Sequence, residues 1–151
     1  MNIYLASSWR NQHQPLAVAY CRSLGHKVYD FKDSEGFSWS EVDPEWKRWD
    51  LDRYVTGLHS PRACAGFRRD KEAILESDAL ILLLPCGKSA HLEAGAAWGL
   101  GKPVGIYIPQ GMMIEPELMY KFASVVSDDL GEILVILSHE VDGKAKKNAT
   151  K

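Results

Sequence analysis

The amino-acid sequence predicts an α/β fold in which a parallel sheet of five strands lies between two layers of helices. Two observations lead to this prediction. Short apolar runs alternate along the chain with longer segments that have helical periodicity. The run ILLLP at residues 81–85 is apolar without a break, as in a central strand that is covered on both faces. This pattern is typical of a three-layer sandwich of the flavodoxin-like or Rossmann-like kind.

The individual elements follow from these runs and from the turn residues between them. Strands are predicted at residues 3–6, 27–29, 79–84, 104–108 and 123–126. Helices are predicted at residues 12–24, 61–76, 90–100 and 128–137. Residues 1–140 are expected to form one domain, and residues 141–151, which lack apolar periodicity, a disordered tail.

Residues 33–52 form a long insertion that is rich in aromatic side chains, among them Trp39. Insertions of this length are often lids or binding loops, and an aromatic face can stack on a planar base. Aromatic side chains also commonly fasten a loop to the protein body. Both interpretations remain open at this point, and Trp39 is a candidate for substrate binding.

Composition narrows the class of ligand. The 151 residues include 18 basic and 20 acidic side chains, so a net charge of -2 gives no reason to expect nucleic acid or a membrane as partner. The 3 cysteines are far apart in the sequence, which indicates neither a disulfide framework nor a zinc cluster. No signal peptide or membrane-spanning run is recognisable. We therefore expect a cytoplasmic protein that binds a small molecule.

Polar loops follow the first and third predicted strands. Ligands of parallel sheets bind beyond the carboxyl ends of the strands, where these loops lie. Ser8 and Arg10 belong to the first loop, and Gly87 and Ser89 to the second, at the start of a helix. Free amide groups at a helix N-terminus favour anions, so the loops are candidates for binding a phosphate or carboxylate.

Two familiar motifs are incomplete in this region. A P-loop would need glycine where the sequence has Leu82, and the His91-Leu92-Glu93 segment lacks the P-C-x-x-C that completes a zinc deaminase site. The sequence therefore predicts no metal and no cofactor. His91 can still cap the helix or orient a carboxylate, although a structural role is the simpler interpretation.

Glu93 and Asp70 are the acidic residues of greatest interest. Glu93 falls in a helix made otherwise of small and apolar residues, where a carboxylate needs a partner, a cleft or a function. A plain interaction with the helix dipole is the alternative. Asp70 lies among charged residues, for which a solvated face is the simpler explanation.

Three motifs in order connect this sequence to a known family. They are the strand and loop IYLASSWR at residues 3–10, an aspartate ahead of the Ser-Asp-Ala start of an apolar strand, and Ser89-x-x-x-Glu93-x-Gly95 followed by Gly-Lys-Pro at 101–103. In this order the chain resembles the nucleoside 2-deoxyribosyltransferase superfamily, including its deoxynucleoside 5'-monophosphate N-glycosidases. The likeness covers most of the chain, but not the aromatic insertion.

The resemblance implies a function and assigns residues to it. Glu93 would be the nucleophile that attacks the anomeric carbon, and Asp70 its acid/base partner. Ser8, Arg10 and Ser89 would bind the sugar-phosphate, with Gly87 and His91 beside them. An ionised carboxylate stabilises or traps the cation-like sugar while an acid protonates the leaving base. The expected activity is hydrolysis of a nucleoside or nucleotide N-glycosidic bond, or deoxyribosyl transfer.

Two further expectations complete the sequence analysis. In the superfamily a neighbouring subunit often completes the site through the segment after the fourth strand, here residues 112–121, so we expect a homodimer or larger oligomer. The alternative to catalysis is a protein that binds or senses a nucleotide in the same cleft without converting it, because a fold alone does not establish a reaction. A salt bridge between Glu93 and Lys102 would favour that alternative.

Overall fold

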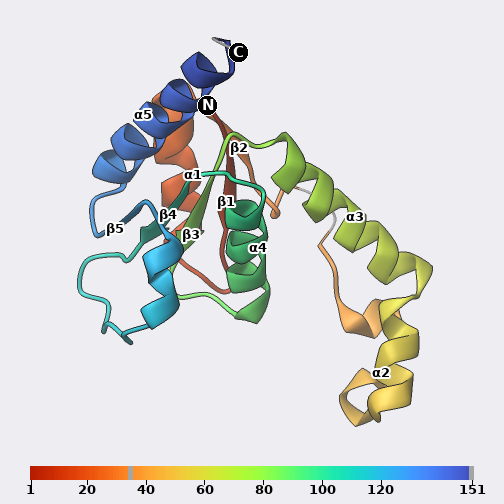
Figure 1. The fold of residues 1–151 in the computed structure, drawn as a ribbon. Helices are drawn as coiled ribbons and strands as arrows, with labels where there is room; N and C mark the ends of the chain where they lie inside the picture. The colour runs from red at the N-terminus through yellow and green to blue at the C-terminus, as the bar shows by residue number, and fades with distance from the viewer. Residues whose placement is uncertain (34–35, 150–151) are drawn as a thin grey trace.

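The computed structural model describes residues 1–33 and 36–149 and contains a parallel sheet of five strands (Figure 1). The strand order is β2-β1-β3-β4-β5, and every neighbouring pair is parallel. The strands are β1 (Asn2–Ala6), β2 (Lys27–Tyr29), β3 (Ala79–Leu83), β4 (Val104–Tyr107) and β5 (Val125–Ser127). The predicted α/β fold is confirmed, and each predicted strand overlaps an observed one.

Helices cover both faces of this sheet. The helices of the described chain are α1 (Gln14–Ser23), α2 (Leu51–Leu58), α3 (Pro61–Glu76), α4 (Lys88–Gly99) and α5 (Leu130–Ala149). Helices α1 and α5 pack on one face and α3 and α4 on the other, whereas α2 lies away from the sheet (Figure 1). Alternate residues of a strand point to opposite faces. Ile3 and Leu5 of β1 therefore join α1 and α5 in one apolar core, whereas Tyr4 and Ala6 join α4 in the other.

Helix α5 is longer than the sequence pattern indicates. It continues to Ala149, so the expectation of a disordered tail is wrong for residues 141–149. This last stretch has little apolar periodicity, but it prolongs a helix whose first turns are anchored in the core by Ile133 and Leu137. Residues 150 and 151, the rest of the expected tail, lie outside the described residues.

A helix that the sequence analysis missed begins at the end of the insertion. Residues 36–58, here named the aromatic arm, comprise the short 3-10 helices η1 (Trp39–Glu41) and η2 (Trp46–Arg48), and α2. The ring of Trp39 makes edge contacts with Trp49 and Tyr54 at centroid distances of 5.5 and 5.9 Å. A Cβ atom at Gly57 would lie 2.5 Å from the Trp49 ring, so α2 depends on glycine there to approach that ring. In Figure 1, α2 and the first half of α3 project away from the sheet.

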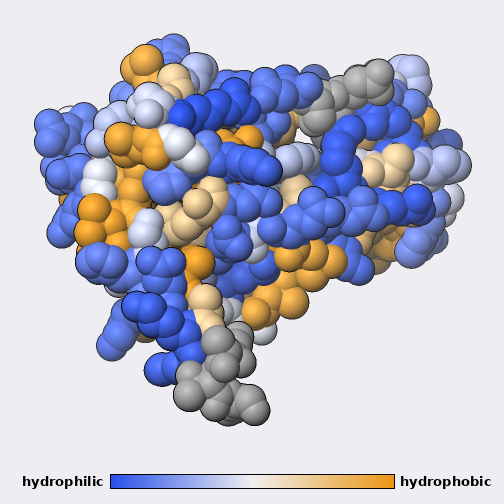
Figure 2. Space-filling model, turned by 90° about the horizontal axis from the view of Figure 1, so that it is seen from above, coloured by the Kyte–Doolittle hydropathy of each residue, from blue (hydrophilic) through white to orange (hydrophobic). Residues whose placement is uncertain are grey.

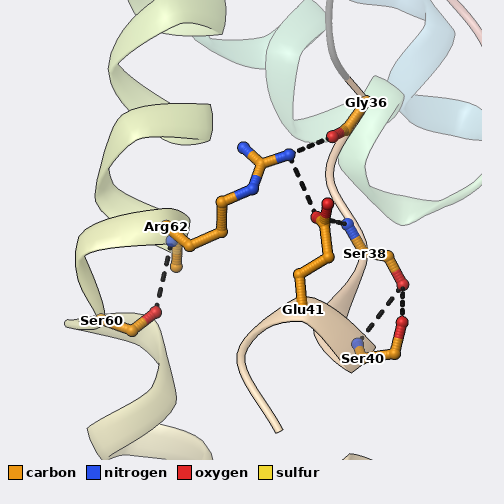
Figure 3. A network of polar contacts seen from close by, with 7 residues as sticks. Gly36, Ser38, Ser40, Glu41, Ser60 and Arg62 are labelled. Carbon is orange, nitrogen blue, oxygen red and sulfur yellow. Dashed lines mark hydrogen bonds and ion pairs between the residues drawn. The ribbon is translucent and has the colours of Figure 1, made fainter. Parts of the chain in front are cut away.

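Polar contacts join the arm to the start of α3 (Figure 3). The Arg62 guanidinium of α3 forms an ion pair of 3.0 Å with Glu41 and donates a hydrogen bond to the Gly36 carbonyl. Ser38 and Glu41 cap η1 reciprocally, and the Ser60 hydroxyl accepts a hydrogen bond from the backbone of α3. Helix α3 therefore begins next to the arm and ends beside the sheet.

Figure 2 shows one face that is hydrophilic over most of its area, with hydrophobic residues in small patches. Among the residues that the structure describes, no helix is both long and apolar enough to cross a bilayer. The same residues contain no group of three or more His, Cys, Asp and Glu side chains arranged to hold a metal ion.

Candidate active site

Three side chains from different elements meet on the α3/α4 side of the sheet. Tyr4 belongs to the inner strand β1 and is only 1% exposed, Glu93 lies in α4, and Asp70 lies in α3. Burial raises the pKa of Glu93 to about 7, the negative charge of Asp70 adds to this effect, and a hydrogen bond from Tyr4 opposes it. The structure thus brings together the two carboxylates that the sequence analysis selected.

A second tyrosine holds Asp70. The Tyr29 hydroxyl, at the end of β2, donates a hydrogen bond of 2.8 Å to Oδ1 of Asp70. The Tyr29 ring stacks on that of Tyr4, with centroids 5.0 Å apart and planes inclined by 19°. Tyr4 also keeps its proton, because burial and the nearby carboxylates raise its pKa far above the ordinary value. Each carboxylate therefore has a tyrosine hydroxyl as a donor.

Local sequence explains why these side chains converge. Residues 4 and 6 of β1 face α4 because β1 alternates, and neighbouring β2 places Tyr29 opposite Tyr4 in the parallel register. Helix α4 packs on this face through Ala90, Ala94 and Ala97. Small side chains let a helix approach a sheet closely, which brings Glu93 toward Tyr4.

Asn11 joins the two polar loops. Its side-chain amide donates to the Ser7 hydroxyl at 3.0 Å and to the Pro85 carbonyl at 3.1 Å, and Ser7 in turn donates to the Leu83 carbonyl at 3.0 Å. Asn11 is 3% exposed, so these bonds satisfy a buried amide. The loop after β1 is thereby fixed against the loop after β3.

The predicted anion-binding residues lie on these two loops. The Ser8 hydroxyl accepts a hydrogen bond of 3.3 Å from the Arg10 backbone, and the Arg10 side chain is exposed. Gly87 is the N-cap of α4, no side chain caps this helix, and Ser89 is exposed in its first turn. The amides at the start of α4 are therefore not occupied by a capping side chain.

His91 has partners at both ring nitrogens. Nδ1 lies 2.9 Å from the Gly87 carbonyl, and Nε2 lies 3.0 Å from the Tyr120 hydroxyl. A carbonyl can only accept, so Nδ1 carries a proton, and in the neutral ring Nε2 accepts from Tyr120. Tyr120 belongs to the 3-10 helix η3 (Leu118–Phe122), so His91 connects η3 to the first turn of α4.

Trp39 and Lys102 have hydrogen-bond or ring partners outside the carboxylate pair. The Trp39 ring is engaged by the aromatic arm, which favours the interpretation that the insertion's aromatic side chains pack the loop itself. In the described part of the chain, no hydrogen bond or ring contact joins Trp39 to Glu93 or Asp70. Lys102 donates to the backbone carbonyls of Leu75 and Ser77 at the end of α3. Its ammonium group therefore serves α3 and does not neutralise Glu93.

Sequence reasoning missed Tyr4, Tyr29 and Asn11. Tyr4 and Tyr29 each occur within a strand, and a tyrosine hydroxyl in a buried strand requires a polar partner, which was a usable signal. Asn11 gave a weaker signal, because polar residues are ordinary in loops.

A cavity of about 720 Å³ lies on the other side of the sheet, where α1, β4 and α5 meet. His13, Tyr20, Tyr107 and Asp128 are among its lining residues, whereas Glu93 and Asp70 are not. The carboxylate pair and this cavity are consequently separate features of the fold.

The fold is similar to those of several solved structures. No protein-family model matches the sequence, and no curated protein matches it. A 2-deoxyribosyltransferase from the psychrotolerant bacterium Bacillus psychrosaccharolyticus is similar in structure, with a TM-score of 0.56 and 24% identity over 88% of this chain and 90% of that one. A conserved protein from Enterococcus faecalis V583 has a TM-score of 0.61 and 16% identity over 93% and 98% of the two chains.

A CMP N-glycosidase from Clostridium botulinum has a TM-score of 0.48 and 16% identity over 91% of this chain and 99% of that one. The resemblance drawn from the sequence motifs is thus confirmed for the fold. This chain has the nucleoside 2-deoxyribosyltransferase-like fold.

Proposed function

We propose that this protein cleaves or transfers the N-glycosidic bond of a nucleoside or nucleotide, with Glu93 as nucleophile and Asp70 as acid/base. The observation that carries the proposal is the convergence of these two carboxylates, from α4 and α3, beside the buried Tyr4 of β1. Similarity of fold to a 2-deoxyribosyltransferase supports the same class of reaction. No metal or cofactor is needed for this chemistry.

The reaction would proceed in two steps. In the first, a carboxylate oxygen of Glu93 attacks the anomeric carbon, the bond to the base breaks, and Asp70 gives a proton to the departing base nitrogen. In the second, water or another base attacks the glycosyl ester while Asp70 takes up a proton, which restores both carboxyl groups. Water as acceptor makes the protein a hydrolase, and a base makes it a transferase.

Electrostatics couples the two roles. A nucleophile must be ionised, and the pKa of Glu93 is raised to about 7 in part by the charge of Asp70. When Asp70 holds the proton it will later donate, that charge is absent and Glu93 ionises more readily. The first step requires the proton on Asp70 and the charge on Glu93, and in that state the repulsion between the two carboxylates is absent.

The loops provide a site for the sugar-phosphate. An uncapped helix N-terminus favours a phosphate through its free amides and the helix dipole. Gly87 and Ser89 lie at this end of α4, and Ser8 and Arg10 lie in the loop that Asn11 fixes beside it. We assign a 5'-phosphate or the sugar hydroxyls of the substrate to this position.

The segment between β4 and β5 is our candidate for subunit contact. Met113, Ile114 and Leu118 in this segment are 89%, 64% and 75% exposed. Apolar side chains exposed together are typical of interaction surfaces. We propose that they pack against another copy of the chain, and that the protein acts in the cytoplasm as a homo-oligomer.

The test is chromatography of free base released from a panel of ribo- and deoxyribonucleosides and their monophosphates, with and without an acceptor base. We expect release by the intact protein, loss of release in Glu93→Ala and strong reduction in Asp70→Asn. Glu72→Gln is the matched control, because Glu72 is exposed on the same helix as Asp70. Absence of release from every substrate, together with nucleotide-dependent thermal stabilisation, would instead establish a binding or sensing protein.

A further inference from the structure

Tyr29 is a tyrosine whose contacts the reaction scheme above does not use. It ends the edge strand β2, is half-buried, and has two specific contacts, its hydroxyl with Asp70 at 2.8 Å and its ring with Tyr4 at 5.0 Å. The stacking contact accounts for the packing of the ring, whereas the hydroxyl contact joins Tyr29 to a carboxylate of the candidate site. The hydroxyl therefore requires an explanation of its own.

The charged and titratable groups around this contact come from four elements. Tyr4 of β1, Glu93 of α4, and Arg69 and Asp70 of α3 all act electrostatically on the pair of carboxylates or on Tyr29 of β2. Burial and Asp70 raise the pKa of Tyr29 to about 12, although Arg69 opposes them. Tyr29 consequently stays protonated and acts as a donor throughout the physiological pH range.

The donor has a defined target. The Tyr29 hydroxyl donates to Oδ1 of Asp70, so this oxygen already accepts a hydrogen bond when Asp70 is ionised. In the protonated form Oδ1 serves as the carbonyl oxygen that accepts from Tyr29, and the acidic proton resides on Oδ2. One oxygen of Asp70 is thus held by the protein, and the other remains for proton exchange.

Arg69 strengthens this arrangement. Its guanidinium lies close enough to Tyr29 to lower the pKa of the phenol. A cation beside a hydroxyl polarises it and makes it a better donor to a carboxylate. The Arg69 side chain also hydrogen-bonds Tyr29, which lowers the pKa of the phenol, whereas its buried Nε atom has no hydrogen-bond partner among the described residues.

We propose that Tyr29 is a positioning residue, which fixes Oδ1 of Asp70 so that only Oδ2 exchanges a proton with the leaving base and the incoming acceptor. The proposal rests on the proposed N-glycosidic reaction. The aromatic stack with Tyr4 gives the phenol a fixed orientation, and Tyr4 in turn contacts Glu93. Tyr29 thereby orients the acid/base relative to the nucleophile without touching the substrate.

The first experiment compares Tyr29→Phe with Tyr54→Phe. The first change removes the hydroxyl and keeps the ring that stacks on Tyr4; the second is a control, because the Tyr54 ring packs in the aromatic arm. For Tyr29→Phe we expect kcat to fall about tenfold or more while KM changes less than about twofold, because a misplaced acid affects proton transfer and not substrate binding. Unchanged kcat, or a rise in KM alone, would overturn the proposal.

A second experiment needs no substrate. The side-chain carboxyl carbon of Asp70 is observed by carbon-detected NMR of protein labelled at aspartate, with Asp70→Asn used to assign its signal. Removing the hydrogen-bond donor to Oδ1 should move the Asp70 carboxyl signal at about pH 7 in Tyr29→Phe, with no change in Tyr54→Phe. An unaltered signal would show that the hydroxyl does not act on Asp70.

The two experiments separate two kinds of failure. If the intact protein releases no base from any substrate, the proposed reaction is wrong and Tyr29 has no role in it, whereas the NMR signal still decides whether Tyr29 acts on Asp70. If base is released and the Asp70 carboxyl signal does not move in Tyr29→Phe, the reaction stands and the role of Tyr29 is refuted.

Discussion

Replacing Glu93 by glutamine should stabilise the protein in a pH-dependent way. The pKa of Glu93 is raised from an ordinary 4.5 to about 7, chiefly by burial. The folded chain therefore binds this proton more tightly than the unfolded chain. The cost of charging Glu93 is absent below about pH 4.5 and complete above about pH 7, so wild-type stability falls between these values.

The expected size follows from the same shift. A tenfold change in proton affinity corresponds to about 1.4 kcal/mol, so charging Glu93 in the folded protein costs about 3 kcal/mol as an upper limit. A glutamine avoids this cost, but its amide is buried with imperfect hydrogen-bond partners, which destabilises the folded protein by about 1 kcal/mol. We expect Glu93→Gln to gain about 1 to 2 kcal/mol at pH 8 and to lose about 1 kcal/mol at pH 4, where only the amide penalty remains.

Urea unfolding at a series of pH values measures this difference. With a typical slope of about 2 kcal/mol per molar urea, the midpoint should rise by about 0.5 to 1 M at pH 8. Glu72→Gln, at an exposed position of α3, should show no such rise. A gain of equal size at both pH values, or a loss at pH 8, would refute the inference that Glu93 is a half-buried acid near another negative charge.

Two further substitutions test features outside the carboxylate pair. Gly57→Ala places a methyl group only 2.5 Å from the Trp49 ring. Unfolding followed by tryptophan fluorescence should therefore show a loss of about 1 to 3 kcal/mol in stability. Unchanged fluorescence and stability would contradict this packing. Tyr120→Phe removes the hydrogen-bond donor to His91. Amide hydrogen exchange of η3 should become faster, while the global free energy of unfolding falls by only about 1 kcal/mol. Exchange protection equal to that of the wild type would show that this bond does not hold η3.

The sheet was predictable because its signal is local and strong. A run such as residues 80–83, apolar at every position, identifies a buried central strand with little ambiguity. Helix α2 was not recognised, because its apolar face is completed by Trp49 and other residues of the arm and not by the sheet. The end of α5 was missed for a related reason, since a helix anchored at its start extends beyond its last apolar residue.

The carboxylates were identifiable individually, but their environment was not. An acid among alanines and glycines drew attention to Glu93, and the family motif drew attention to Asp70. Only the three-dimensional arrangement shows that Tyr4 and Tyr29 stack between them, because the two residues are adjacent through strand pairing and are distant in sequence. The sequence analysis expected Glu93 to be ionised, whereas a pKa of about 7 leaves it partly protonated at neutral pH.

Helix α3 also has a mechanical consequence. At about 1.5 Å per residue, its 16 residues form a rod about 24 Å long, held by the arm at one end and by the sheet at the other. If the rod tilts by about ten degrees around its C-terminal end, the arm moves about 4 Å while Asp70, about 9 Å from the pivot, moves about 1.5 Å. A displacement of that size breaks a hydrogen bond. The contacts that fix the position of the arm therefore also fix the position of Asp70. A substitution in the arm can thus displace Asp70 by tilting α3, without contacting the site.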